Sequence, residues 1–152
     1  MHRLLAVLFM AFAVPASACA SNVLPTTIIT SADKPRLLKL EMALTPETRA
    51  RGLMQRKTLK PNDGMVFFFP IAAPYKFWMK DTLIPLDMLF VDEAGVIVYI
   101  ATAKPLSLKL VGPTTPIDTV IELEAGRAAH EGIAVGDKVT YAVKKHPRHL
   151  AR

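Results

Sequence analysis

Turn-forming residues recur every few positions along most of this chain, and they leave room only for short elements. The 152 residues include 12 prolines and 7 glycines. Clusters such as Pro61–Gly64, Asp92–Gly95 and Gly136–Asp137 separate runs that are rich in β-branched and aromatic side chains. Short strands bounded by such clusters are typical of antiparallel β proteins. We therefore predict a mainly β fold: a compact antiparallel β barrel or sandwich-like single domain with one or two short helices.

The predicted strands follow from the apolar pattern. In Arg36–Leu44, apolar side chains at every second position indicate a half-buried strand. Met65–Phe69 is wholly apolar and short, which favours a buried strand over a helix. Further strands are predicted at Thr26–Thr30 (an edge strand), Phe77–Lys80, Leu86–Val91, Val96–Ala101, Thr119–Glu124 and Val139–Val143.

Two short helical segments interrupt these strands. Thr45 can cap a helix, Pro46 suits the first helical position, and Glu47 complements the positive end of the helix dipole. Gly52 follows soon after, so this helix should be short. Arg127–Gly132 is predicted as a second short irregular or helical piece, and Asp92–Gly95 fits a hairpin loop.

The first 20 residues have the order of a secretory signal. A short positive stretch precedes the apolar run Leu4–Val14, and small residues follow Pro15. Cleavage after Ala18 or Ala20 is expected, and Cys19 also allows lipoprotein processing, although Ala16 stands where a lipobox has a large aliphatic residue. We predict a signal peptide over residues 1–20, one globular β domain over 21–143 and a basic tail over 144–152. The mature chain is expected in the periplasm or the cell envelope.

Charge and cysteine count exclude several classes of function. The net charge is +6, but four basic residues lie in the tail and one in the leader, so the domain itself is nearly neutral and gives no case for nucleic-acid binding. One cysteine supports neither a disulfide framework nor a multi-cysteine metal site. The histidines lack metal-ligand spacing, and no phosphate-binding glycine loop or nucleophile elbow is present. We expect no metal, no cofactor, no transmembrane helix in the mature chain, and a monomer.

Several blocks of the sequence together resemble the domain of unknown function 192 family. They are Arg51-Gly52-Leu53-Met54 with Arg56, Gly64-Met65-Val66-Phe67, the long block Phe77–Asp87, and Val120-Ile121-Glu122-Leu123, followed by Gly126, Gly132-Ile133 and Gly136-Asp137. The resemblance covers about residues 36–143, with Asp81 where the family often has Asn. It implies a compact, mostly β single domain, frequently carried behind a signal sequence or membrane anchor. It implies no activity.

The Phe77–Asp87 block supplies most of the predicted binding site. In a strand starting at Phe77, Trp78 and Lys80 would share one face and form a flat contact platform. Asp87 lies within an apolar frame and needs a partner such as Arg51 or Lys80 if it is buried. We predict that Arg51, Trp78, Lys80 and Asp87 line one ligand-binding cleft. The alternative is that Trp78 is core and Lys80 forms an ion pair with Asp81, Asp87 or Asp92.

Carboxylates are the remaining candidates for chemistry. Asp81, Asp87, Asp92 and Glu122 could provide an acid–base pair, although Glu122 alternates with Glu124 as in a half-solvated strand. We therefore predict an exported binding module whose partner is a small molecule, a cell-wall or lipid component, or another envelope protein. The alternatives are a small envelope hydrolase that uses carboxylates near Lys80 or Arg51, and a purely structural envelope protein. Catalytic residues stay unassigned.

Overall fold

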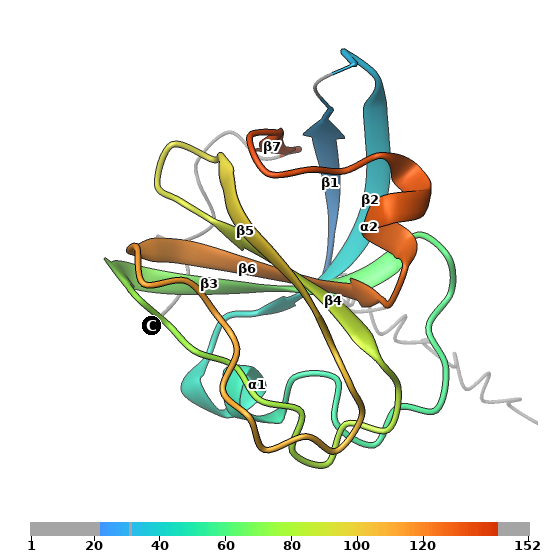
Figure 1. The fold of residues 1–152 in the computed structure, drawn as a ribbon, viewed down its shortest axis with the longest axis vertical. Coiled ribbons are helices and arrows are strands. Elements are labelled where there is room, and N and C mark those ends of the chain that lie inside the picture. The colour runs from blue at the N-terminus through green and yellow to red at the C-terminus, as the bar shows by residue number, and fades with distance from the viewer. Residues whose placement is uncertain (1–21, 31, 143–152) are drawn as a thin grey trace, which may run out of the picture.

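The computed structural model describes residues 22–30 and 32–142, and in this part of the chain a single seven-stranded sheet dominates (Figure 1). Its strands lie in the order β5-β4-β6-β3-β2-β1-β7. The sheet is strongly curved and not closed, so the fold is sandwich-like rather than a barrel. An isolated bridge joins Val96, just before the edge strand β5, to Lys138 of the other edge strand, β7. The elements are β1 (Val23–Ile29), β2 (Pro35–Ala43), α1 (Pro46–Arg51), β3 (Asp63–Ala73), β4 (Leu86–Val91), β5 (Ile97–Ala103), β6 (Ile117–Glu124), α2 (Arg127–Glu131) and β7 (Lys138–Tyr141).

The mainly β prediction is confirmed, and most predicted strands correspond to observed ones. Neighbouring strands pair antiparallel except β2 and β3, which run parallel because α1 and its following loop carry the chain back between them. The segment Thr26–Thr30 is not an edge, since β1 lies between β2 and β7. Val143, the predicted end of the last strand, lies outside the described residues, as do the predicted signal peptide over residues 1–20 and the predicted tail over 144–152.

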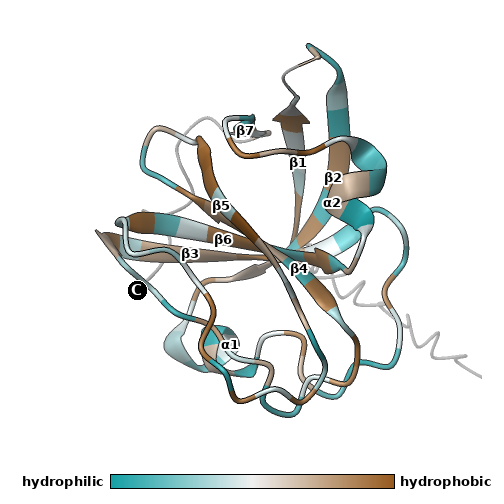
Figure 2. Cartoon of the chain, in the orientation of Figure 1, coloured by the Kyte–Doolittle hydropathy of each residue, from teal (hydrophilic) through white to brown (hydrophobic). Residues whose placement is uncertain are grey.

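Both faces of the central strands are covered. β4 is buried along its whole length, and β6 is buried from Ile117 to Leu123. Alternate residues of these strands feed two apolar clusters: Val66, Leu89 and Ile121 enter one, and Phe67, Phe90 and Val120 enter the other. Figure 2 shows apolar residues along the strands and hydrophilic residues over much of both helices. Each cluster lies on one face of the sheet.

The first cluster is covered by α2, and the second by α1 and the long connections around it. Ala128 and Ile133 from the α2 region pack into the first cluster, whereas Leu53, which follows α1, packs into the second. No helix among the described residues is both long enough and apolar enough to span a bilayer.

Helix α1 begins and ends where the sequence predicts. The Thr45 hydroxyl accepts a hydrogen bond from the Thr48 amide at 3.2 Å, and the Thr48 hydroxyl accepts one from the Thr45 amide at 2.9 Å. This reciprocal capping box satisfies two amides that would otherwise be free at the helix start. Gly52 ends the helix with a φ of 50°. The chain then turns directly into the core with Leu53.

The segment Phe77–Lys80 is not a strand, which corrects the sequence prediction. It forms a single bridge, Phe77 to Val111, and then turns through Asp81, whose φ is 54°. Its side chains still alternate, because Met79 is fully buried while Trp78 and Lys80 are exposed. The segment covers the second apolar cluster without joining the sheet, and this position brings it close to α1 and Gly52.

Candidate functional site

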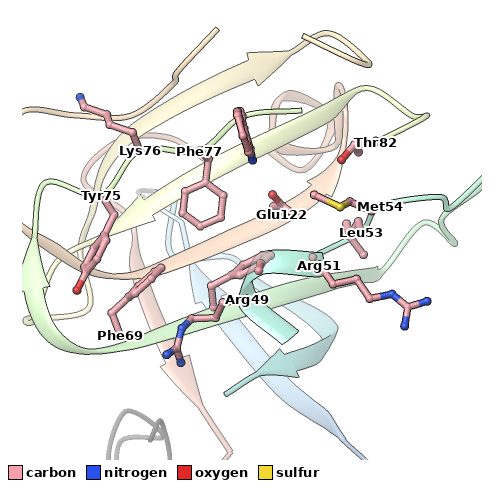
Figure 3. Close-up of a pocket in the computed structure, with 14 residues that line it drawn as sticks. Arg49, Arg51, Leu53, Met54, Phe69, Tyr75, Lys76, Phe77, Thr82 and Glu122 are labelled. Carbon is pink, nitrogen blue, oxygen red and sulfur yellow. The ribbon is translucent and has the colours of Figure 1, made fainter. Parts of the chain in front are cut away.

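A pocket of about 250 Å³ lies between α1, the end of β3 and the segment 75–82. Figure 3 shows its lining, which comes from four separate parts of the chain. The turn after α1 gives one wall, and β6 gives the floor. The lining residues are Arg49, Ala50, Arg51, Gly52, Leu53, Met54, Phe67, Phe69, Tyr75, Lys76, Phe77, Trp78, Thr82 and Glu122.

Aromatic rings form most of the walls. Phe69 and Tyr75 are stacked with their ring centroids 3.8 Å apart, and Phe77 meets Phe67 edge to face at 5.0 Å. Trp78 completes the lining and is 46% exposed, so it is a surface ring at the pocket and not part of the core. Rings locked against one another in this way offer a rigid apolar surface to a ligand.

A single carboxyl group lies at the floor of this pocket. Glu122 is 5% exposed, and Figure 3 shows its side chain reaching into the space beside Phe77 and Met54. Among the described residues, its side chain has no hydrogen-bond or ion-pair partner. Burial in these apolar surroundings raises the pKa of Glu122 to about 8, since the charged form loses its hydration. The group is therefore mostly a neutral carboxylic acid at pH 7.

Glycine at position 52 keeps this acid accessible. A Cβ there would lie 3.2 Å from Cζ of Phe67 and 3.8 Å from Oε2 of Glu122. The positive φ of Gly52 also disfavours any side chain. One residue thus ends the helix and leaves the pocket open above Glu122.

Three basic side chains line the pocket around the rings. Arg49 is held by the carbonyls of Leu44 at 2.6 Å and Phe68 at 3.2 Å, and its guanidinium lies 5.6 Å from the centre of the Phe69 ring. Lys76 donates to the carbonyls of Gly112 and Pro113, each at 2.6 Å. Arg51 is exposed and has no hydrogen-bond or ion-pair partner among the described residues.

The structure brings together some of the residues predicted to bind a ligand. Arg51 and Trp78 both line the pocket. Lys80 is beside it, with its Nζ 5.6 Å from the centre of the Trp78 ring, and forms no ion pair with a described residue. The alternative in which Trp78 is core and Lys80 pairs with an acid is therefore wrong. The ligand-binding role of these residues stays a prediction.

Asp87 does not reach the pocket. It is 2% exposed, and its carboxylate accepts a hydrogen bond from the Thr102 hydroxyl at 2.7 Å and another from the Ala128 amide at 2.9 Å. Its partners are thus β5 and the start of α2, and not Arg51 or Lys80. The geometry indicates that Asp87 joins elements of the fold.

Of the other candidate carboxylates, Asp81 and Asp92 lie outside the pocket lining, and Glu122 lies in it. Asp81 is exposed in a turn, and Asp92 accepts hydrogen bonds from the amides of Ala94 and Val96 within the hairpin loop. Glu122 was expected on a half-solvated strand face beside Glu124. That expectation is wrong for Glu122, because β6 is a central strand with both faces covered, and right only for the exposed Glu124 at its end.

Sequence reasoning also missed the residues that complete the walls. Nothing in the sequence alone marks Phe69 and Tyr75; the stacking of Phe69 on Tyr75 and its edge-to-face contact with Phe77 reveal their place. A signal for Glu122 was present: an acid flanked by Val120, Ile121 and Leu123 in a run that is otherwise apolar. No group of three or more histidine, cysteine or acidic side chains in the described part of the chain could hold a metal.

Comparison with known proteins places the chain among relatives of the same fold. None of the curated proteins searched matches it. A protein from Sinorhizobium meliloti, provisionally named a transcription regulator, has a crystal structure that is similar with a TM-score of 0.77; the two are 36% identical over 79% of this chain and 94% of that one. A protein of unknown function from Novosphingobium aromaticivorans is 34% identical over 84% of this chain and 93% of that one, with a TM-score of 0.75. The family model described as DUF192, uncharacterized ACR, matches residues 27–141, and the chain therefore belongs to this family.

Proposed function

We propose that this chain is an exported ligand-binding module and that the aromatic pocket over Glu122 is its binding site. The observation that carries the proposal is Glu122 itself. A buried carboxyl group without a protein partner reduces stability, and an apolar side chain in the same place would not. Groups with strongly shifted pKa values in concave sites are frequently functional. A ligand that hydrogen-bonds to Glu122 would offset the cost of its burial.

The composition of the pocket supports the same proposal. The blocks by which the sequence resembles its family meet there, although they are far apart along the chain. Gly52 and Met54 come from the first block, Phe67 from the second, Trp78 from the third and Glu122 from the fourth. Packing of the core does not require a half-exposed tryptophan next to a glycine and a buried acid. Their meeting at one pocket therefore supports a binding role for these blocks.

The hydrolase alternative has less support. Hydrolysis by paired carboxylates requires two such groups on either side of a scissile bond. Among the described residues that line the pocket, Glu122 is the sole acid. Thr82 lines the pocket too, but its hydroxyl donates to the carbonyl of Lys80 at 3.2 Å.

A thermal-shift screen of the purified protein tests the binding proposal. We expect at least one compound class among muropeptides, phospholipid head groups, glycans and small organic acids or amines to raise the melting temperature by several degrees near 100 times its Kd. Glu122→Gln should reduce that rise, and Glu124→Gln, an exposed position on the same strand, should leave it unchanged. Equal rises in both variants would place the ligand elsewhere, and a blank screen would count against a small-molecule site.

Export is the second part of the proposal, and the order of residues 1–20 supports it. We expect protein recovered from the periplasm or envelope of a bacterial host to begin after Ala18 or Ala20, or at a lipid-modified Cys19. Intact mass spectrometry distinguishes the three, and Cys19→Ser removes only the lipid-modified form. A full-length chain confined to the cytosol would contradict export and leave the pocket proposal untouched.

A further inference from the structure

We propose that the pocket selects a small organic anion: a molecule with an apolar body that enters between the rings and a carboxylate that remains at the basic rim near Arg51. This inference rests on the proposed binding function and adds the class of ligand. It follows from the charges around the pocket, from their partners and from the size of the space.

The charges that line the pocket are unbalanced. Three basic side chains, Arg49, Arg51 and Lys76, lie around a single acid, Glu122. Glu122 contributes little negative charge at neutral pH, because burial favours its neutral form. The lining therefore carries a net positive charge, which attracts anions and disfavours cations.

Acids among the described residues do not form ion pairs with these basic groups, although Glu47, exposed on α1, has an electrostatic interaction with Arg49. Arg49 and Lys76 bind backbone carbonyls, which are uncharged acceptors, and no ion pair within 4.0 Å involves either of them or Arg51 in the described part of the chain. Arg56, in the loop after α1, is different: it pairs with Glu41 through two hydrogen bonds, at 2.6 and 2.5 Å. The cations at the pocket thus keep their capacity for an external anion.

Arg51 is the group with the most freedom to bind such an anion. Figure 3 shows its guanidinium extending outward from the pocket, and the side chain is exposed and unrestrained. An exposed arginine without a protein partner is free to rotate toward a ligand, and its planar guanidinium can bind a carboxylate through two parallel hydrogen bonds. Arg49 and Lys76, held in place by carbonyls, add a fixed positive field.

The interior fits an uncharged body. The walls are rings, and the space of about 250 Å³ is smaller than the roughly 300–1,000 Å³ of drug-sized sites, so the occupant is a small molecule or the end of a chain. At the floor, protonated Glu122 can donate one hydrogen bond and accept another. Both a free organic acid and the C-terminus of a peptide have the required carboxylate and apolar body.

A charge series with one shared body tests the inference. 3-Phenylpropionate, 3-phenylpropanamide and 3-phenylpropylamine carry the same ring and chain with an anionic, a neutral and a cationic end. Trp78 is the sole tryptophan of the chain, so its indole N–H gives one identifiable cross-peak in a ¹⁵N-correlation spectrum of the purified protein. Titrations of this cross-peak give the Kd of each compound. N-acetyl-Gly-Phe and its C-terminal amide extend the comparison to peptide ends.

We expect the carboxylate to bind at least tenfold more tightly than the amide and the amine, and to weaken as salt is raised. Arg51→Gln should lower the affinity for 3-phenylpropionate to that for 3-phenylpropanamide, and the affinity for the amide should not change. Lys57→Gln, an exposed basic residue outside the pocket, is the matched control and should change nothing. A stronger response to the peptide acid than to 3-phenylpropionate would identify chain ends as the favoured source.

Other outcomes overturn the inference in distinguishable ways. Equal affinity for the carboxylate, the amide and the amine, or a preference for the amine, would reject an anion site while showing that the pocket binds ligands. Unchanged carboxylate affinity in Arg51→Gln would reject the role of Arg51. No movement of the indole cross-peak with any compound would reject the anion inference, and the broader thermal-shift screen would then decide separately whether the pocket binds anything.

Discussion

Protonation of Glu122 links the stability of the folded protein to pH. Burial raises the pKa of this group from 4.5 to about 8, so between these values the folded protein holds a proton that the unfolded chain has lost. The free energy of unfolding should therefore fall as the pH rises from about 4.5 to 8, by up to ~1.4 kcal/mol per pH unit from this group. Above pH 8 its contribution to the slope disappears.

Glu122→Gln removes this dependence, because the amide does not titrate. We expect the variant to match or exceed the wild-type stability at pH 7.5 and to show a flatter profile in urea denaturation between pH 5 and 8. Glu124→Gln is the control and should retain the wild-type slope, since Glu124 is exposed. Parallel profiles for wild type and Glu122→Gln would show that Glu122 is not held in its neutral form.

Asp87 is also a buried acid, but unlike Glu122 it has hydrogen-bond partners within the protein. Asp87→Ala leaves the amide of Ala128 without its acceptor and frees the Thr102 hydroxyl. We expect a loss of about 1–3 kcal/mol in the free energy of unfolding, measured by urea denaturation. Thr102→Val removes one of the two bonds and should lose less. A stability unchanged by Asp87→Ala would contradict the structural role.

At the scale of elements, the capping box of α1 fixes where the wall of the pocket begins. Thr45→Ala removes the acceptor for the Thr48 amide, and we expect it to lower the free energy of unfolding by about 1 kcal/mol. Thr58→Ala is the matched control, since Thr58 is exposed and has no side-chain hydrogen bond among the described residues. Equal losses in the two variants in urea denaturation would show that the cap contributes nothing specific.

Elements whose signals are local could be predicted from the sequence. The start of α1 depends on Thr45 and Pro46, the hairpin on Asp92 and Gly95, and the strand β2 on its own alternation. The strand prediction for Phe77–Lys80 is wrong because the segment has the apolar, aromatic composition of a strand without being one. Among the described residues, the segment pairs with another strand-like segment only at the bridge from Phe77 to Val111. Whether a segment finds a pairing partner depends on the whole fold and not on its own residues.

At the scale of the whole molecule, the pocket depends on which strands are central. Local alternation assigns Glu122 to one face of β6 but cannot tell whether that face is covered. The pairing of β6 with both β3 and β4 buries it, with Met65 and Met88 as its cross-strand neighbours. Arg51 and Trp78 could be proposed as site residues from their sequence neighbours, Gly52 beside Arg51 and Lys80 two positions after Trp78. That they line the same pocket as Glu122 could be learned only from the three-dimensional structure.

The aromatic pocket over Glu122 is the place where we propose that this protein binds its ligand. The most direct test is to map the first compound that raises the melting temperature by its chemical-shift changes in ¹⁵N-correlation spectra. We predict the largest changes at Gly52, Phe77 and the Trp78 indole, around Glu122. Changes centred instead on the depression lined by Tyr99, Thr102 and Lys109, with the Trp78 indole unmoved, would contradict ligand binding in the aromatic pocket.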